Sequence, residues 1–159
     1  MSGGEASKAA APRERRHRAR EAALQMLYQW EVGRTDIAEV LRTYWAIDRP
    51  DEPALPKSLA AFATELASGT VARIDEIDPL ILANAEHWRP SRMAIVDRLI
   101  LRMAVFEFLH LPDIPRKVVI NEALELARTF STDEAIGFVN GILDAIKRGL
   151  ESDGETERP

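Results

Sequence analysis

The best candidate for binding chemistry in this sequence is a run of cationic side chains near the N-terminus. The basic positions are Arg15, Arg16, His17, Arg18 and Arg20. The residues that follow have the apolar spacing of a helix. A helix N-terminus already carries about half a positive charge, so a stable helix normally places acidic residues there. Guanidinium groups and backbone N–H groups at one helix end together predict a site for an anion.

The distribution of charge agrees with an anion site at one place. Residues 1–20 contain six Lys and Arg against two Glu, a net charge of +4, whereas the whole chain has a net charge of −5. A basic arm on an acidic body favours a local anionic partner over general binding of polyanions. A solvated basic arm without a ligand is the alternative that charge alone leaves open.

A second candidate binding residue is Phe138. The apolar stripe expected along the last helix consists of Val139, Ile142, Leu143, Ile146 and Leu150. Phe138 lies about 100 degrees away from this stripe and is therefore expected to be partly exposed. An aromatic ring on the flank of a helix can stack an unpaired base. A phenylalanine at the edge of the core is the alternative.

Patterns typical of enzymes are missing from the sequence. It contains no cysteine, no HExxH pair, no phosphate-binding glycine loop and no nucleophile elbow. Glu107 and His110 form one Glu-x-x-His, but a di-iron bundle needs a second copy and two more glutamates, so both are expected at the wet end of a helix. Glu122 and Glu125 are expected on a solvated face. The sequence therefore predicts no catalytic residue, no metal and no cofactor.

These candidate residues are expected to lie on helices, because no segment shows the alternation of apolar and polar residues that is typical of a strand. Residues 93–111 have apolar side chains on nearly every side of a helix, which predicts the central helix of a bundle. Arg98 and Arg102 are expected along the one edge of this helix that is exposed to solvent. The charged residues within the segment argue against a membrane-spanning helix. Other helices are expected at about residues 14–32, 36–47, 57–74, 78–86, 116–130 and 131–150. The predicted fold class is all-α with about seven helices.

Local signals mark helix ends and one close contact. Asp36 and Ser91 are expected to cap the second and the central helix, and Ser131 followed by Glu134 predicts a capping box for the last helix. Gly69, inside the third helix, is expected to mark a close helix contact.

Composition predicts three regions of the chain. Residues 1–12 are too poor in large apolar groups to fold and are expected to be disordered. Residues 13–150 are expected to form one helical domain, and residues 151–159 a flexible tail. The lack of cysteine and of a secretory signal favours the cytoplasm and no membrane.

Two segments resemble the signature regions of the NusB transcription antitermination family. They are RRHRAREAALQMLYQWE at residues 15–31 and DIPRKVVINEALELARTFSTDEAIGFVNGILD at residues 113–144. The segment VDRLILRMAVFEFL at residues 96–109 is similar to the family's fifth helix. The resemblance runs in order over about residues 15–150. It implies a bundle of two packed helical subdomains, about residues 13–90 and 91–150, and a role without enzymatic activity.

The resemblance also implies partners. Family members bind the boxA segment of ribosomal RNA leader transcripts together with NusE, a small-subunit ribosomal protein, and act on the elongating RNA polymerase. The residues implied for RNA contact are Arg15, Arg16, His17, Arg18, Arg20, Lys117 and Phe138. Tyr28 and Asp97 lie on the face implied for NusE. Some relatives form homodimers that cover the arginines, and this state is open here.

The sequence departs from the family pattern beside Phe138. Gly137 and Ala135 stand where many members have a lysine and a serine, and the loss of that lysine is expected to weaken the RNA surface without changing its location. Two other functions stay open. One is a protein-binding helical adaptor without sequence-specific RNA recognition. The other is the targeting domain of an RNA methyltransferase, which would need a longer chain with a glycine-rich cofactor loop.

Overall fold

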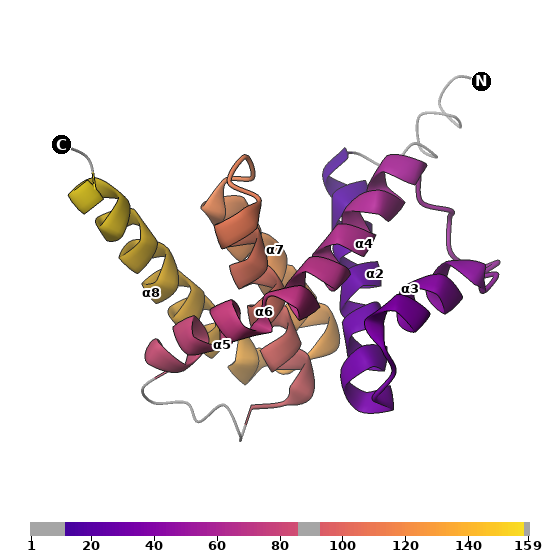
Figure 1. The fold of residues 1–159 in the computed structure, drawn as a ribbon, viewed down its shortest axis with the longest axis horizontal. Helices are drawn as coiled ribbons and strands as arrows, with labels where there is room; N and C mark the ends of the chain where they lie inside the picture. Colours follow the sequence, from indigo (N-terminus) through magenta and orange to yellow (C-terminus); the bar gives the residue numbers. More distant parts are fainter. Residues whose placement is uncertain (1–11, 86–92, 158–159) are drawn as a thin grey trace. The chain divides into compact units, whose positions relative to one another are not determined.

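The computed structural model describes residues 12–85 and 93–157, and within these ranges the chain forms seven helices and no strand (Figure 1). The predicted all-α fold class is confirmed. The disorder expected for residues 1–11 and the cap expected at Ser91 lie outside the described residues, while Pro12 already begins the first helix. None of the helices within the described ranges has the length and apolar character needed to cross a membrane.

The helices are α2 (Pro12–Gly33), α3 (Ile37–Ala46), α4 (Lys57–Ala72), α5 (Ile74–Ala83), α6 (Ile95–His110), α7 (Arg116–Phe130) and α8 (Asp133–Glu157). The chain divides into two compact units between Ala67 and Ser68, inside α4. α4 contributes residues to both units: Leu66 is buried before the division, and Gly69 packs on Phe106 after it. The subdomain boundary near residue 90, which the family resemblance implies, stays a prediction.

In the N-terminal unit, α2 packs against α3. The buried face of α2 contains Ala19, Ala23, Met26 and Leu27, which recur at steps of three and four residues as the core face of a helix requires. The predicted cap of α3 is confirmed, because the Asp36 carboxylate accepts a hydrogen bond of 3.3 Å from the Ala38 N–H. The aromatic pair Tyr44 and Trp45 ends α3. The Trp45 indole donates to the Thr64 hydroxyl of α4 at 3.0 Å.

In the C-terminal unit, α6 packs against α5, α7 and α8. Every residue from Leu99 to Phe108 is buried. The prediction that Arg102 reaches water is therefore wrong: its side chain is enclosed, and its guanidinium donates to both carboxylate oxygens of Asp78 on α5, each at 2.9 Å. The prediction that Glu107 and Glu122 are exposed to solvent is also wrong, because both side chains are buried.

The start of α8 differs from the predicted capping box. The Thr132 hydroxyl, not that of Ser131, accepts the hydrogen bond from the Ala135 N–H, at 3.2 Å. Ser131 instead ends α7 and donates its hydroxyl to the Asp97 carboxylate on α6. A sequence reading based on neighbours could not find this bond, because its partners are 34 positions apart.

Two other helix ends lie outside the predicted bounds. α5 begins at Ile74, so Pro79 is inside the helix and not in its first turn as expected. α8 continues through Glu157, into residues for which the sequence predicts a flexible tail. Lys147 pairs with Glu151 at 3.5 Å, one helical turn along, and such pairs favour the continued helix.

The close contact expected at Gly69 is confirmed. A Cβ atom added there would lie 2.2 Å from Cζ of Phe106, which is itself buried in the core. We expect Gly69→Ala to lower the free energy of unfolding by about 1–3 kcal/mol, the usual cost of overpacking a core. Urea denaturation monitored by circular dichroism measures the change.

Gly141→Ala is the matched control for this prediction. A Cβ atom at this exposed position of α8 meets nothing within 4 Å. The control variant should therefore gain about 0.5–1 kcal/mol from the higher helix propensity of alanine. Equal stabilisation in both variants would contradict the packing account of Gly69.

Candidate nucleic-acid interface

The predicted cationic residues of α2 differ in their exposure. Arg16 is exposed, and Arg15, His17 and Arg18 are partly exposed, all within about one turn of the helix. Arg20 is only 2% exposed, and its guanidinium lies 5.3 Å from the centroid of the Phe62 ring. Arg20 therefore has the surroundings of a packing residue, whose charge is stabilised in part by the aromatic face.

The partly exposed residues of this set are held by neighbours. His17 lies 3.0 Å from the carboxylate of Glu21, one turn along α2. Arg18 donates from its terminal amino group to the backbone carbonyl of Pro53, in the loop between α3 and α4. Such contacts restrict long side chains that would otherwise sample many rotamers, which lowers the entropy lost when a ligand binds.

Arg15 contributes an unusual donor to this helix end. Its Nε atom is buried, and no hydrogen-bond acceptor for it occurs among the residues that the structure describes. Buried donors without an acceptor are rare because they cost free energy. A phosphate oxygen is an acceptor of the kind that such a group needs.

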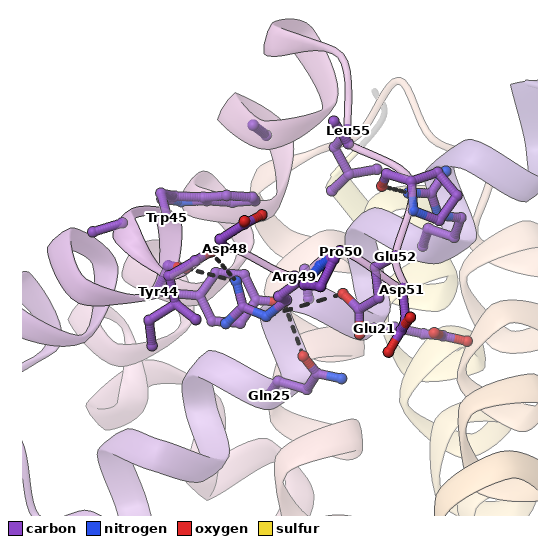
Figure 2. Close-up of a pocket in the computed structure, with 17 residues that line it drawn as sticks. Glu21, Gln25, Tyr44, Trp45, Asp48, Arg49, Pro50, Asp51, Glu52 and Leu55 are labelled. Atoms are coloured by element: carbon purple, nitrogen blue, oxygen red, sulfur yellow. Dashed lines mark hydrogen bonds and ion pairs between the residues drawn. The ribbon is translucent and has the colours of Figure 1, made fainter.

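A cavity of about 690 Å³ lies next to Arg18, beneath the loop that joins α3 to α4. Figure 2 shows Arg49 inside it, with its guanidinium against the ring of Tyr44. The two groups are 3.8 Å apart, and the Tyr44 hydroxyl donates to Gln25 of α2 at 2.8 Å. Burial raises the pKa of Tyr44, although the nearby Arg49 charge acts in the opposite direction. The phenol is therefore neutral and acts as a donor.

The C-terminal unit holds the other two residues predicted to contact RNA. Lys117 is exposed in the first turn of α7, and Phe138 is partly exposed near the start of α8, as its offset from the apolar stripe predicts. At 1.5 Å per residue, about 20 Å of α7 separates Lys117 from the connection that leads to Phe138. Phe138 lies in the second turn of α8, which packs against α7.

The two residues predicted to contact a protein partner also differ. Tyr28 is 45% exposed and, with Val32, lines a groove of about 370 Å³ between α2 and α3. Asp97 is only 4% exposed and its carboxylate accepts the hydrogen bond from Ser131. Tyr28 thus has the exposure that a direct contact needs, whereas Asp97 is placed to hold α6 to the α7–α8 connection. Partner contact by both remains a prediction.

Sequence reasoning missed Arg49. The helices expected at about residues 36–47 and 57–74 leave residues 48–56, which contain three prolines, as a connecting loop. Nothing in the local pattern indicates that one cation of this loop returns to the aromatic residues of α3. The one available signal was the spacing of Arg49 five residues after Tyr44, which is weak. No group of three or more His, Cys, Asp or Glu side chains that could hold a metal occurs in the described part of the chain.

The sequence profile of the NusB family matches residues 17–148. The transcription antitermination protein NusB of Koribacter versatilis is 46% identical over 138 residues, which cover 87% of this chain and 92% of that protein. The protein of the same name from Myxococcus xanthus is 44% identical, with 85% of this chain and 96% of the relative covered.

Solved structures of similar fold carry related names. T. maritima NusB is 35% identical with a TM-score of 0.74, and the match covers 84% of this chain and 90% of that one. A crystal structure of the antitermination factors NusB and NusE in complex with double-stranded RNA contains a chain that is 27% identical, with a TM-score of 0.72. That match covers 86% of this chain and 98% of the other. The names given to these relatives are those of transcription factors and not of enzymes.

The buried carboxyl of Asp97 predicts a dependence of stability on pH. Burial raises the pKa of Asp97 above its ordinary value of 3.8, although the Ser131 hydrogen bond acts in the opposite direction. The folded chain therefore keeps this proton to a higher pH than the unfolded chain, so its contribution to the free energy of unfolding falls as pH rises above that value. Asp97→Asn should therefore gain stability relative to the native chain as pH rises above about 4. Thermal unfolding at several pH values measures the difference.

Asp113→Asn, which removes an exposed carboxylate from the same unit, is the control. Its stability difference from the native chain should change less over the same pH range. A difference for Asp97→Asn that does not vary with pH would contradict the effect of burial.

Proposed function

Because this chain belongs to the NusB family, we propose that it is a transcription antitermination factor that binds RNA without catalysing a reaction. Its RNA ligand is the boxA segment of ribosomal RNA leader transcripts, and its protein partner is NusE. In the cytoplasm, the assembly acts on the elongating RNA polymerase and suppresses termination.

The observation that carries this proposal is the basic end of α2. Arg15, Arg16, His17 and Arg18 all reach solvent within two turns of one helix, in a chain whose net charge is negative. Cations at a helix N-terminus oppose the helix dipole, so this arrangement lowers local stability unless an anion is bound. A phosphate backbone supplies such anions at regular spacing.

Each residue of the proposed RNA site has a distinct part. Arg15, Arg16 and Arg18 bind phosphates, and His17 adds a hydrogen-bond donor beside them. Arg20 supports the helix end from within, over Phe62. In the C-terminal unit, Lys117 binds a further phosphate and Phe138 stacks a base, which accounts for a partly exposed aromatic on a helix flank.

The residues proposed for NusE act in different ways. Tyr28 contacts the partner directly, at the groove that it forms with Val32. Asp97 acts indirectly, because its bond to Ser131 fixes the connection between α7 and α8. A helical adaptor that binds only proteins through its arginines is the second candidate, and specificity for one RNA sequence decides against it.

The first test removes the exposed arginines. We expect Arg15→Ala, Arg16→Ala and Arg18→Ala combined to weaken binding of a labelled boxA RNA at least tenfold, because phosphate contacts dominate RNA affinity. The slope of log affinity against log salt concentration should fall by about 2, at roughly 0.7 per lost phosphate contact. Fluorescence anisotropy over a salt series, with and without NusE, measures both quantities.

A matched triple variant controls for the loss of charge. Arg42, Arg73 and Arg148 have side chains that are 76%, 55% and 71% exposed, and none lies near the start of α2 in sequence. Their combined change to Ala should leave the affinity within about threefold, because exposed charges away from the contact are screened by salt. Equal binding of boxA and scrambled RNA by the native chain would instead support the protein-binding adaptor. Measurement of the molecular mass of each sample in solution shows whether the chain forms a homodimer, which could cover the arginines.

The second test concerns the aromatic ring on α8. Phe138→Leu keeps an apolar side chain but removes the π face, and should weaken boxA binding by about 1–3 kcal/mol, or roughly fivefold to hundredfold. Phe138→Tyr keeps the ring and should bind about as tightly as the native chain. A similar loss in both variants would show that Phe138 acts through packing and not through stacking.

A further inference from the structure

We propose that Arg49 is a positioning residue for RNA binding: it holds the α3–α4 loop in the place from which Pro53 orients Arg18. The inference rests on the proposed function, since it assumes that Arg18 binds phosphate. Arg49 itself makes no contact with RNA in this proposal. It acts through the loop.

Apolar packing does not hold this loop in place. Of residues 47–54, all are exposed except Arg49. Beneath them lies the cavity of about 690 Å³, so the loop covers a space that side chains do not fill. A segment with few buried apolar contacts has low local stability, and its position must depend on specific polar contacts.

Arg49 provides these contacts. Its guanidinium carbon lies 3.8 Å from the centroid of the Tyr44 ring, over the ring face, and the guanidinium donates to the Tyr44 carbonyl at 2.7 Å (Figure 2). The Tyr44 hydroxyl in turn donates to Gln25, so the ring that receives Arg49 is fixed to α2. Arg49 Nε also lies 4.0 Å from the Glu52 carboxylate. A planar guanidinium can stack, donate and pair at once, which the ammonium group of lysine cannot do with the same geometry.

A short segment of the α3–α4 loop connects Arg49 to the residue that binds Arg18. The Glu52 N–H donates to the Arg49 carbonyl at 3.0 Å, which closes a turn directly before Pro53. The Pro53 carbonyl then accepts the hydrogen bond from the Arg18 amino group. Four residues thus connect the anchored guanidinium to the arginine that is proposed to bind RNA, and Gln25 and Arg18 lie on the same helix.

The charges around the cavity place the phosphate outside it. The lining contains Glu21, Asp48, Asp51 and Glu52 against the two cations Arg18 and Arg49. A phosphate inside would meet four carboxylates, which is unfavourable at close range. The bond to Pro53 uses one amino group of Arg18, and the remaining N–H donors of its planar fork are those that bind the ligand.

The test measures boxA RNA affinity by anisotropy for Arg49→Ala, Arg18→Ala and the double variant. We expect Arg49→Ala to weaken binding about twofold to tenfold, the effect of releasing one rotamer-rich side chain. In the Arg18→Ala background the same change should have no further effect, because Arg49 acts through Arg18. Additive losses would overturn the proposal, since they would mean that Arg49 contacts RNA or acts by long-range charge.

Arg42→Ala is the control for charge. It removes one cation from α3, where the side chain is 76% exposed and pairs only weakly with Glu39 at 3.8 Å. The control should leave the affinity unchanged, and a loss equal to that of Arg49→Ala would overturn the proposal. Arg49→Lys keeps the charge but not the planar stack, and its affinity should lie between those of the native chain and Arg49→Ala. Circular dichroism and thermal unfolding establish that each variant is folded.

The outcomes separate this inference from the proposed function. If Arg18→Ala weakens binding and Arg49→Ala does not, the positioning role is wrong and the RNA site stands. If boxA RNA binds no better than its scramble, and neither change has an effect, the proposed function fails together with the inference. If Arg49→Ala does not fold, the comparison of Arg49→Lys with the native chain and with its Arg18→Ala double variant decides the same question.

Discussion

The burial of residues 99–108 of α6 on all sides is the constraint on which the C-terminal unit depends. Because α5, α7 and α8 pack against this helix, each of its buried charged residues must find a partner inside the fold. Arg102 meets both oxygens of Asp78, and Asp97 meets the Ser131 hydroxyl. At its C-terminal end, His110 lies 3.1 Å from Glu76. These polar contacts join α6 to α5 and to the α7–α8 connection, and they fix the register of helices whose apolar faces alone would allow sliding.

In the N-terminal unit the charged residues must stay accessible to solvent and not become buried. These residues are basic, and they lie at a helix N-terminus whose dipole is unfavourable to positive charge. Burying Arg20 over Phe62 removes one cation from the exposed set, and the imidazole of His17 lies 3.0 Å from the Glu21 carboxylate. The remaining arginines keep the unfavourable interaction with the helix dipole, which an anionic ligand would relieve. Stability at this end of α2 is therefore lower than the helix could achieve, and affinity for an anion is correspondingly higher.

The fold was predictable where one helix face determines the outcome. The bounds of α7 agree with the sequence, because prolines precede it and its apolar spacing is regular. Predictions failed where a partner lies far along the chain. Arg102 and Asp78 are 24 positions apart, and Ser131 and Asp97 are 34 apart. A prediction from helical periodicity places an isolated charged residue in solvent and treats a serine before an apolar run as a helix cap. It does so because it considers only residues close in sequence and not side chains on another helix.

The candidate site was likewise predictable only where residues close in sequence determine it. Charge density located the arginines at the start of α2, but it could not separate Arg20, which is buried, from Arg16, which is exposed. Nor could it show that Arg18 bonds to Pro53, 35 positions away. This difference matters for a protein proposed to bind without catalysis. Its affinity depends on how many cations are held in position before RNA arrives, because each side chain ordered in advance costs nothing at binding. Residues that hold those cations, although they never touch the ligand, are therefore part of the proposed RNA site in energetic terms.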